Sequence, residues 1–277
     1  MSRADQIFIE MCKDIIVNGY SSEGEKVRPV WADTNEPAHT VKKFGVVNRY
    51  NLSEEFPILT LRPTSLNKAV DELLWIWQKK SNNINDLNSK IWDAWADETG
   101  SIGKAYGYQL GVKHKYKEGE FDQVDRVLYN LQHNKYSRRI MTNMYNHEDL
   151  HEMNLYPCAY SVTFNVTENR LNAILNQRSQ DILVANNWNV CQYAVLVHMF
   201  AQVNGLIAGE LVHVIADAHI YDRHIPIIQE MIKRPVYDAP VLKVNDQVTD
   251  FYQFTPEDFT LIGYKAGEQI KGIPVAV

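Results

Sequence analysis

Apolar residues recur with the spacing of amphipathic helices in three stretches, each preceded by a residue type that commonly caps a helix. Ser2 precedes the first stretch, Thr64 or Ser65 the second, and Asp122 the third. These side chains can accept hydrogen bonds from the free N–H groups of a first helical turn. The pattern therefore predicts where each helix begins.

Two further helices are predicted in the second half of the chain. The stretch 188–203 is apolar nearly all round, which predicts a buried central helix that ends at Gly205. The segment 217–221, Asp-Ala-His-Ile-Tyr, is predicted to open another helix, which Pro235 would close.

Short apolar and alternating runs predict strands at 44–47 and 58–61, and a hairpin around the turn 167–170. If Val166 pairs with Leu171, the apolar residues of both hairpin strands line one face. Helices and strands alternate without a repeating βαβ rhythm. The pattern therefore predicts an α+β fold, with a mixed β-sheet and a buried central helix, in one domain over residues 1–277.

The same register places Cys158 opposite Ser179, at the end of the hairpin. Strict alternation then points Arg178 to the other face of the sheet. A bulge or a strong twist at the strand end is needed to turn Arg178 toward Cys158.

Composition narrows the function. Hydrophobic residues make up 45% of the chain and charged residues 22%, which is typical of a globular protein rather than a disordered one. The net charge of −6 argues against nucleic acid or a membrane surface as the main partner. No run of 18 apolar residues indicates a membrane span.

Three scattered cysteines fit neither a disulfide framework nor a zinc site, and favour a reducing, cytoplasmic setting. Cys12 and Cys191 lie within apolar helical patterns and are predicted to be inert. Cys158 follows Pro157 and faces a polar strand end, so it is the candidate nucleophile. Arg178 is expected to raise its thiolate fraction.

Arginine cannot take the thiol proton, so the site needs a further acid or base. Glu72, inside an apolar helical pattern, and Tyr106, in a glycine-spaced loop, are the candidates. Glu72 could instead be a carboxylate at the edge of a helix face. The adjacent Arg138 and Arg139 are either a solvated rim or a clamp for a phosphate or carboxylate.

Several segments, in this order along the chain, together resemble thymidylate synthase. They are 72–75 (Glu-Leu-Leu-Trp), 91–97 (Ile-Trp-Asp-Ala-Trp-Ala-Asp), 137–140 (Ser-Arg-Arg-Ile), 155–158 (Leu-Tyr-Pro-Cys), 177–181 (Gln-Arg-Ser-Gln-Asp), Asn189, 217–221 (Asp-Ala-His-Ile-Tyr) and 274–277 (Pro-Val-Ala-Val). The resemblance covers roughly residue 40 to the end.

The resemblance implies a methyltransferase that converts deoxyuridylate (dUMP) to thymidylate (dTMP). The co-substrate would be 5,10-methylenetetrahydrofolate, which supplies both the carbon and the hydride and leaves as dihydrofolate. No metal, flavin or nicotinamide is then expected. Cys158 would add to carbon 6 of uracil, with Glu72, Arg178 and Tyr106 as the other catalytic residues.

The resemblance also assigns binding residues. At the nucleotide it implies Arg28, Arg138, Arg139, Gln177, Arg178, Ser179, Asp181, Asn189, His219 and Tyr221. At the folate it implies Arg62, Ile91, Trp92, Trp95, Leu155, Asp181 and Ala276. It further implies a homodimer, formed through one face of the sheet, in which Arg138 and Arg139 reach the partner's phosphate site.

Some positions depart from the family pattern. Ala159 stands where histidine commonly follows the cysteine, and Ala185 stands where glycine is common. The segment 26–33 replaces a glycine-rich loop, and Arg28 is the substitute for its phosphate-binding arginine. These changes suggest a divergent bacterial or phage-type branch.

Two alternatives remain open on the residues. A deoxyuridylate or deoxycytidylate hydroxymethylase of the same fold would deliver water instead of hydride, and a cytosine substrate would call for a carboxylate where Asn189 stands. The other alternative is a nucleotide- or RNA-binding regulator that has lost catalysis. Intact Cys158, Arg178 and Glu72 argue against that loss.

Overall fold

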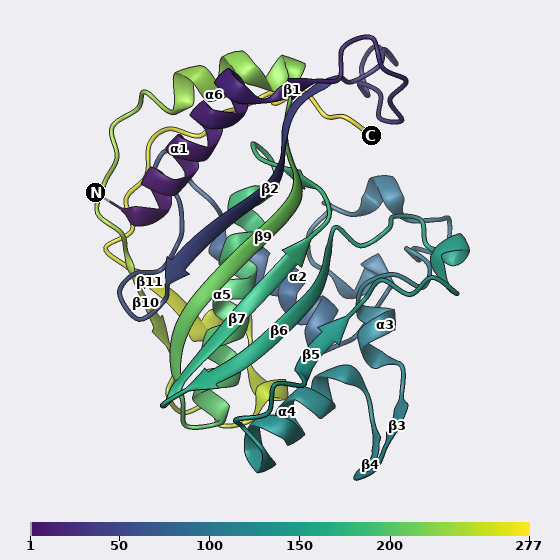
Figure 1. The fold of residues 1–277 in the computed structure, drawn as a ribbon, viewed down its shortest axis with the longest axis vertical. Coiled ribbons are helices and arrows are strands. Elements are labelled where there is room, and N and C mark those ends of the chain that lie inside the picture. Colours follow the sequence, from purple (N-terminus) through teal and green to yellow (C-terminus); the bar gives the residue numbers. More distant parts are fainter. Residues whose placement is uncertain (1) are drawn as a thin grey trace.

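A seven-stranded mixed sheet forms the centre of the computed structural model, which describes residues 2–277 (Figure 1). Its strands run in the order β1-β2-β9-β7-β6-β5, and β8 pairs with β9 beside this path. β7 and β8 lie parallel to β9, while the other neighbouring pairs are antiparallel. The bounds are β1 Tyr20–Ser21, β2 Thr40–Asn51, β5 Ile140–Asn143, β6 Ala159–Thr167, β7 Arg170–Gln177, β8 Gln180–Asp181 and β9 Ile207–Tyr221. The α+β prediction with a mixed sheet is confirmed.

The α-helices are α1 Arg3–Asn18, α2 Leu66–Trp77, α3 Gly107–Gly111, α4 Gln123–His133, α5 Asn186–Val203 and α6 Ile225–Met231. Three begin at predicted caps. The side chains of Ser2, Ser65 and Asp122 accept from backbone N–H groups in the first turns of α1, α2 and α4. A local hydrogen bond thus decides where each of these helices starts.

The remaining elements are short. Two-stranded sheets form from β3 His114–Tyr116 with β4 Gly119–Phe121, and from β10 Val241–Val244 with β11 Phe259–Ile262. The 3-10 helices are η1 Ile84–Asp86, η2 Asp93–Trp95, η3 Leu150–Glu152, η4 Asp222–His224, η5 Phe251–Gln253 and η6 Pro256–Asp258. In residues 2–277, no helix is both long and apolar enough to cross a membrane.

Helix α5 lies behind the sheet in Figure 1 and packs on β7, β9 and α2. Its residues Ala194, Val195 and Phe200 are fully buried, as the apolar pattern predicts. Gly205 follows the helix with a φ of 62°, a conformation that glycine adopts without the penalty of a Cβ. The predicted central helix is therefore confirmed, and it closes one face of the sheet.

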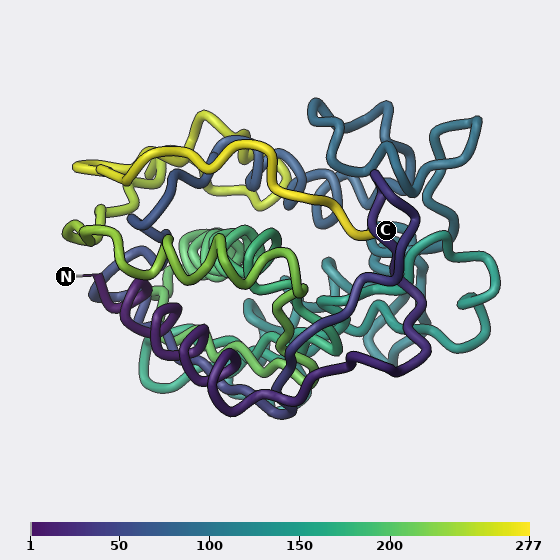
Figure 2. The backbone as a smooth tube through the Cα atoms, turned by 90° about the horizontal axis from the view of Figure 1, so that it is seen from above, coloured from purple at the N-terminus to yellow at the C-terminus, as the bar shows by residue number. Residues whose placement is uncertain are grey.

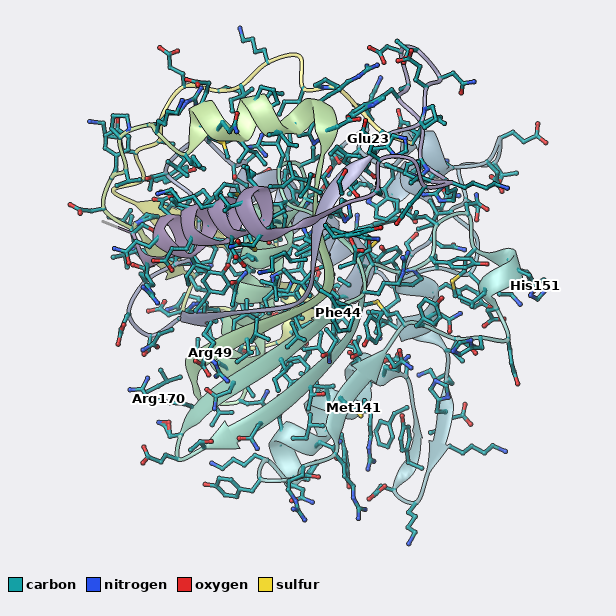
Figure 3. All side chains as sticks on the ribbon, turned by 45° about the horizontal axis from the view of Figure 1, so that its top comes forward. Glu23, Phe44, Arg49, Met141, His151 and Arg170 are labelled. Carbon is teal, nitrogen blue, oxygen red and sulfur yellow. The ribbon has the colours of Figure 1, made fainter. Side chains whose placement is uncertain are left out.

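The opposite face of the sheet is open. Phe44 is 91% exposed and Met141 53% exposed, and both are labelled in Figure 3. Ile174 and Val47 are also largely exposed. Met141 pairs with Thr163 and Thr163 with Ile174, so two exposed apolar side chains flank a threonine in one row across three strands. An open apolar face of this kind is typical of a protein–protein interface.

Two predictions about secondary structure were wrong. The segment 58–61 is buried but is not a strand, because side chains and not a neighbouring strand satisfy much of its backbone. The N–H of Leu59 donates to Asn187 Oδ1 at 3.0 Å, and that of Thr60 donates to Asp5 Oδ1 at 2.9 Å. The segment 217–221 ends β9 instead of opening a helix, since β2 and β8 pair with it on either side. Helix α6 begins only at Ile225.

The chain ends against a loop from the N-terminal region. Val30 and Val277 exchange backbone hydrogen bonds at 3.0 and 2.9 Å, and Trp31 bridges to Ala276. His224 Nε2 lies 2.8 Å from the Pro274 carbonyl oxygen. Figure 2 shows the yellow C-terminal segment ending beside the purple N-terminal loop. The apolar C-terminus is thus docked onto the body of the protein.

Candidate active site

The hairpin β6–β7 delivers the candidate nucleophile. Val166 pairs with Leu171 as predicted, but the register shifts between Ala159 and Ser161. Beyond this bulge the Arg178 N–H donates to the Cys158 carbonyl oxygen at 2.9 Å. The predicted pairing of Cys158 with Ser179 was therefore wrong by one residue. The bulge is also the feature that turns Arg178 toward the cysteine.

The Arg178 guanidinium holds the loop before Cys158. Its Nε donates to the Pro157 carbonyl oxygen at 2.9 Å, and its Nη2 donates to that of Tyr156 at 2.7 Å. Nη2 also lies 3.7 Å from Cys158 Sγ. Arg178 thus positions the thiol by bonding to two carbonyl groups, and its Nη1 hydrogens remain available for an anion.

The thiol of Cys158 is half-buried, and burial raises its pKa. Arg178, a hydrogen bond with Tyr106, and Arg28 oppose this rise. Arg178 lowers the thiol pKa, as expected, but the cost of burying the charge is larger, so the net shift is upward. The pKa values of Cys12 and Cys191 are raised by burial with no opposing group, which fits their predicted inertness.

Tyr106 connects the cysteine to the tryptophan cluster. Its hydroxyl accepts from the Cys158 N–H at 3.0 Å, and its ring centroid lies 5.1 Å from that of Trp92. Its φ is 45°, which is unusual for a residue with a side chain. Strained backbone of this kind commonly occurs at functional sites.

Glu72 lies on α2 and is buried, with both carboxylate oxygens held by indoles. Trp92 Nε1 donates to Oε1 at 3.0 Å, and Trp188 Nε1 donates to Oε2 at 2.6 Å. Burial raises the pKa of Glu72 to about 7, against the opposing effect of hydrogen bonds from Trp188, Trp92 and Gln192. A carboxyl group with such a pKa can both accept and donate a proton near neutrality.

A second polar cluster, which we call the amide relay, runs from the backbone of α2 to β9. Gln192 Nε2 donates to the Ala69 carbonyl oxygen at 3.1 Å, and Asn189 Nδ2 donates to Gln192 Oε1 at 3.0 Å. Gln177 Nε2 donates to Asn189 Oδ1 at 3.1 Å, and His213 Nε2 lies 2.7 Å from Gln177 Oε1. Asn189 is the half-exposed member, so it presents the relay to solvent.

The end of β9 brings further predicted binding residues to the same region. His219 Nδ1 lies 2.8 Å from Asp217 Oδ1, and its ring is 5.2 Å from that of Tyr221. Burial raises the pKa of Tyr221 to about 12, with a further rise from Asp181 and an opposing effect of Arg28. The charge of the exposed Arg28 lowers the pKa of both Cys158 and Tyr221.

Asp181 and Arg62 meet at the turn after β8. Asp181 Oδ1 accepts from the N–H groups of Leu183 and Val184 at 2.9 and 3.0 Å. Arg62 Nη2 donates to the Leu183 carbonyl oxygen at 2.5 Å. Part of the Arg62 guanidinium is therefore engaged with the protein itself. Ser179 lies half-buried in the short link before β8.

The predicted folate residues around η2 form an aromatic surface. Trp92 is buried, and its ring centroid lies 5.8 Å from that of Trp95. Ile91 is 42% exposed beside them, and Leu155 packs at the edge of the core. An exposed apolar side chain next to two indoles packed edge to face suits a flat heterocycle.

Arg138 and Arg139 are the predicted residues that the chain does not bring to its own cysteine. Both are exposed, and neither side chain bonds to another residue within 2–277. They precede Ile140, which pairs with Phe164, six positions beyond Cys158 along β6. At about 3.3 Å per residue, the two arginines lie roughly 20 Å along the strand from the thiol.

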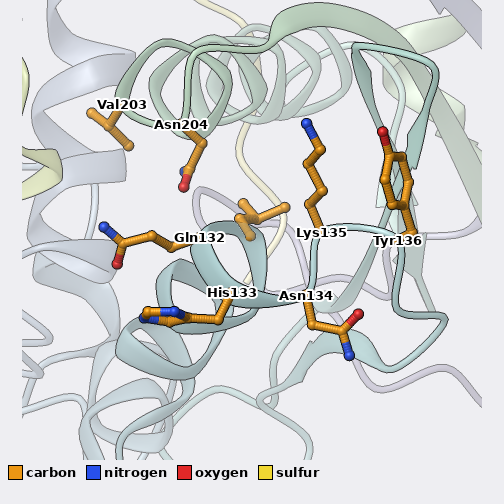
Figure 4. Close-up of a pocket in the computed structure, with 8 residues that line it drawn as sticks. Gln132, His133, Asn134, Lys135, Tyr136, Val203 and Asn204 are labelled. Carbon is orange, nitrogen blue, oxygen red and sulfur yellow. The ribbon is translucent and has the colours of Figure 1, made fainter.

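A separate hollow of about 560 Å³ lies where α4 and α5 end (Figure 4). Its lining includes His133, Lys135, Tyr136 and Asn204. None of the predicted catalytic residues lines it. Its position just before Arg138 places it on the side of the molecule away from Cys158.

Sequence reasoning missed Trp188, Gln192 and His213. Each lies in an apolar run, which made it look like ordinary core packing. The available signal was chemical, because a buried indole, amide or imidazole needs a hydrogen-bond partner. A polar side chain inside a fully apolar helix therefore predicts a hydrogen-bond partner elsewhere in the core, such as a buried carboxylate.

Comparisons with known proteins agree with this geometry. A family model described as thymidylate synthase matches residues 6–277. Thymidylate synthases of Bacillus subtilis subsp. natto and of Bacillus phage phi3T are each 43% identical over 274 residues, which is 98% of this chain and 98% of each relative. The solved thermostable thymidylate synthase A from Bacillus subtilis matches with a TM-score of 0.94 and 42% identity, over 99% of both chains. The chain therefore belongs to the thymidylate synthase family, whose members methylate dUMP to dTMP.

Proposed function

We propose that the chain carries out this methylation through a covalent bond between Cys158 Sγ and carbon 6 of uracil. The observation that supports the proposal most strongly is the set of groups around Cys158. It is the one free cysteine in residues 2–277 whose thiol contacts an arginine and whose backbone N–H bonds to a tyrosine hydroxyl. The arginine charge lowers the cost of ionising this buried thiol.

The chemistry follows from the addition. As Sγ bonds to carbon 6, the thiol proton leaves and the electron pair of the 5,6 double bond moves toward the O4 carbonyl. Carbon 5 thereby becomes the nucleophile that accepts the new carbon. Carbon 5 then loses its proton as the bond between the new carbon and the folate nitrogen breaks. A hydride reaches the resulting methylene carbon, and departure of Cys158 restores the 5,6 double bond. When bound, 5,10-methylenetetrahydrofolate supplies the carbon and the hydride and leaves as dihydrofolate.

Glu72 is the proposed acid–base group beside the pyrimidine. Its pKa of about 7 lets it hold or release a proton at working pH. Asn189 is the proposed reader of the uracil edge, since its amide offers both a donor and an acceptor. Gln177 orients Asn189 through the bond at 3.1 Å, and Tyr106 holds the backbone at Cys158.

We assign the phosphate to Arg178 Nη1, Ser179 and Arg28, with Arg138 and Arg139 from a partner subunit. Two exposed arginines about 20 Å from their own thiol are well placed to serve another chain. The open sheet face supports a homodimer, because it exposes the apolar side chains of Phe44, Val47, Met141 and Ile174. His219 and Tyr221 are the proposed ribose contacts.

The residues predicted at the folate fit a pterin and its apolar linker. Asp181 Oδ1 is engaged by two backbone N–H groups, which leaves Oδ2 for the N–H groups of a pterin. Ile91, Trp92, Trp95 and Leu155 provide the apolar contact surface. Arg62 remains the proposed contact for the glutamate tail. The C-terminal segment at Ala276 would exclude water from the reacting atoms.

The proposal treats residues 1–277 as a single catalytic domain working in a reducing cytoplasm, where Cys158 stays a free thiol. Incubation with labelled dUMP and 5,10-methylenetetrahydrofolate tests it. The expected products are dTMP and, by absorbance, an equal amount of dihydrofolate. A hydroxymethylated nucleotide without dihydrofolate would instead identify a hydroxymethylase, and absence of turnover would contradict catalysis.

A further inference from the structure

The direction of the amide relay is set at its α2 end. The Ala69 carbonyl oxygen can only accept, so the group of Gln192 that lies 3.1 Å from it must be the amide nitrogen. The Gln192 oxygen then faces Asn189 and must receive a hydrogen from Asn189 Nδ2, at 3.0 Å. The orientation of Asn189 thus follows from a backbone carbonyl and not from the side chain alone.

The same logic continues to the other end. Asn189 Oδ1 accepts from Gln177 Nε2, which leaves Gln177 Oε1 to accept from His213 Nε2 at 2.7 Å. His213 must therefore carry its proton on Nε2. Burial lowers the pKa of His213 to about 3, which keeps the ring neutral. Its Nδ1 is buried without a hydrogen-bond partner, which suits a nitrogen that carries no proton.

Reversing Asn189 is costly at both ends of the relay. Gln192 would have to turn its oxygen toward the Ala69 carbonyl, which places two acceptors against each other. Gln177 would turn its N–H toward His213, which would then have to move its proton to Nδ1. No acceptor lies there among residues 2–277. Buried donors and acceptors without partners destabilise a structure strongly, so one orientation prevails.

That orientation matters for base choice. Uracil presents an N3–H donor beside the O4 acceptor, whereas cytosine presents an N3 acceptor beside an amino donor. An amide held in one orientation matches one of these patterns and opposes the other. Within the relay, Asn189 uses one lone pair of Oδ1 and one N–H of Nδ2. Its second lone pair and its second N–H remain free to bond to a base.

We propose that His213 is a specificity-determining positioning residue, which acts through Gln177 to hold the Asn189 amide in the orientation that accepts uracil and rejects cytosine. The inference rests on the proposed role of Asn189 in reading the base. His213 itself is fully buried and bonds to Gln177, so its proposed effect on the base is indirect.

The test compares dissociation constants of dUMP and dCMP for the wild type, His213→Leu and His213→Gln. The wild type is expected to prefer dUMP. His213→Leu removes the donor, and the preference should fall by about ten-fold or more. His213→Gln retains an N–H donor at similar reach and should keep most of the preference. A folded His213→Leu variant with unchanged preference would overturn the proposal, as would equal losses in both variants.

His198→Leu is the matched control. His198 Nε2 is buried without a hydrogen-bond partner, and burial lowers the pKa of His198 to about 4. His198 lies on α5 but is not a member of the amide relay. This substitution should leave the preference for dUMP unchanged. An equal loss of preference in this control would contradict a specific role of His213.

Nitrogen-15 NMR of labelled histidines gives a readout that does not depend on the variants. The wild-type enzyme should show His213 neutral with its proton on Nε2. A proton on Nδ1, or a charged ring at pH 7, would overturn the inference even if His213→Leu failed to fold. Lack of dTMP formation by the wild type would count against the proposed function, whereas a failed relay leaves that turnover intact.

Discussion

Two regions of the molecule differ in where their polar side chains find hydrogen-bond partners. One is the buried polar region around Glu72, and the other is the exposed pair Arg138 and Arg139. Glu72 and the amide relay find their partners inside one chain, at distances of 2.6 to 3.1 Å. Arg138 and Arg139 have no side-chain partner within residues 2–277 and face solvent.

The difference suggests a division of work within the proposed site. Buried polar groups must be paired on folding, so the proposed pyrimidine end would be organised before substrate arrives. Exposed arginines stay hydrated at little cost and can bind an anion presented by another molecule. We therefore expect chemistry at the base to depend on the single chain and phosphate binding to depend on assembly.

Replacement of the nucleophile should give the largest effect. Cys158→Ser should lower the rate of dTMP formation by about 10⁴-fold or more, because a serine hydroxyl is far less ionised than a thiol. Cys191→Ser is the control, since this buried thiol lies 3.7 Å from Asn187 Oδ1 and outside the proposed chemistry. The rate is followed by dihydrofolate absorbance. Wild-type turnover by Cys158→Ser would exclude the covalent mechanism.

A substitution in the amide relay should alter the preference for uracil over cytosine. Asn189→Asp replaces the donor amide with an acceptor that suits the amino group of cytosine. The ratio of kcat/KM for dUMP to that for dCMP should fall by about 10²-fold, because mismatched buried polar groups discriminate strongly. Unchanged preference would count against Asn189 as the reader of the base.

A change at the exposed arginines should affect binding more than chemistry. Arg139→Ala should raise the KM for dUMP about ten-fold, since a charge-assisted bond to phosphate is lost. Arg170→Ala removes another exposed arginine, at the hairpin turn, and should have no effect (Figure 3). Steady-state kinetics separates KM from kcat. A KM no higher than that of the Arg170 variant would argue against a phosphate contact.

The smallest predicted effect comes from removing the Trp188 indole that donates to Glu72. Trp188→Phe removes the donor to Oε2, which stabilises the ionised carboxylate, so the pKa of Glu72 should rise above about 7. If ionised Glu72 acts in catalysis, the acid limb of the kcat profile moves roughly one unit to higher pH, with several-fold lower activity at pH 7. Trp77→Phe, on the same helix as Glu72, is the control. An unmoved limb would contradict this role of Trp188.

Local chemistry explains what the sequence predicted well. Helix starts depend on caps within three residues of the helix, and the hairpin register depends on one turn, so Ser65 and Val166 were sufficient guides. The resemblance to a family named the expected site residues. Their placement near Cys158 then followed for Arg178 and Tyr106.

Distant pairings explain what the sequence did not predict. The bond between Trp188 and Glu72 joins residues 116 positions apart. The segment 217–221 is a strand because β2, far earlier in the chain, pairs with it. The bulge between Ala159 and Ser161 depends on how β6 meets both β5 and β7. Tertiary packing overrides local preference in each case.

Mixing two impaired variants tests most directly whether the proposed site is divided between two chains. An Arg139→Ala chain keeps Cys158, and a Cys158→Ala chain keeps Arg139, so each hybrid dimer contains one complete site. At low dUMP, Arg139→Ala alone retains about a tenth of wild-type activity. With random exchange about a quarter of all sites are complete, so the mixture should reach about a quarter of the wild-type level, compared with about one-twentieth without exchange. Absence of recovery, despite subunit exchange demonstrated by mass, would contradict a phosphate site shared between two chains.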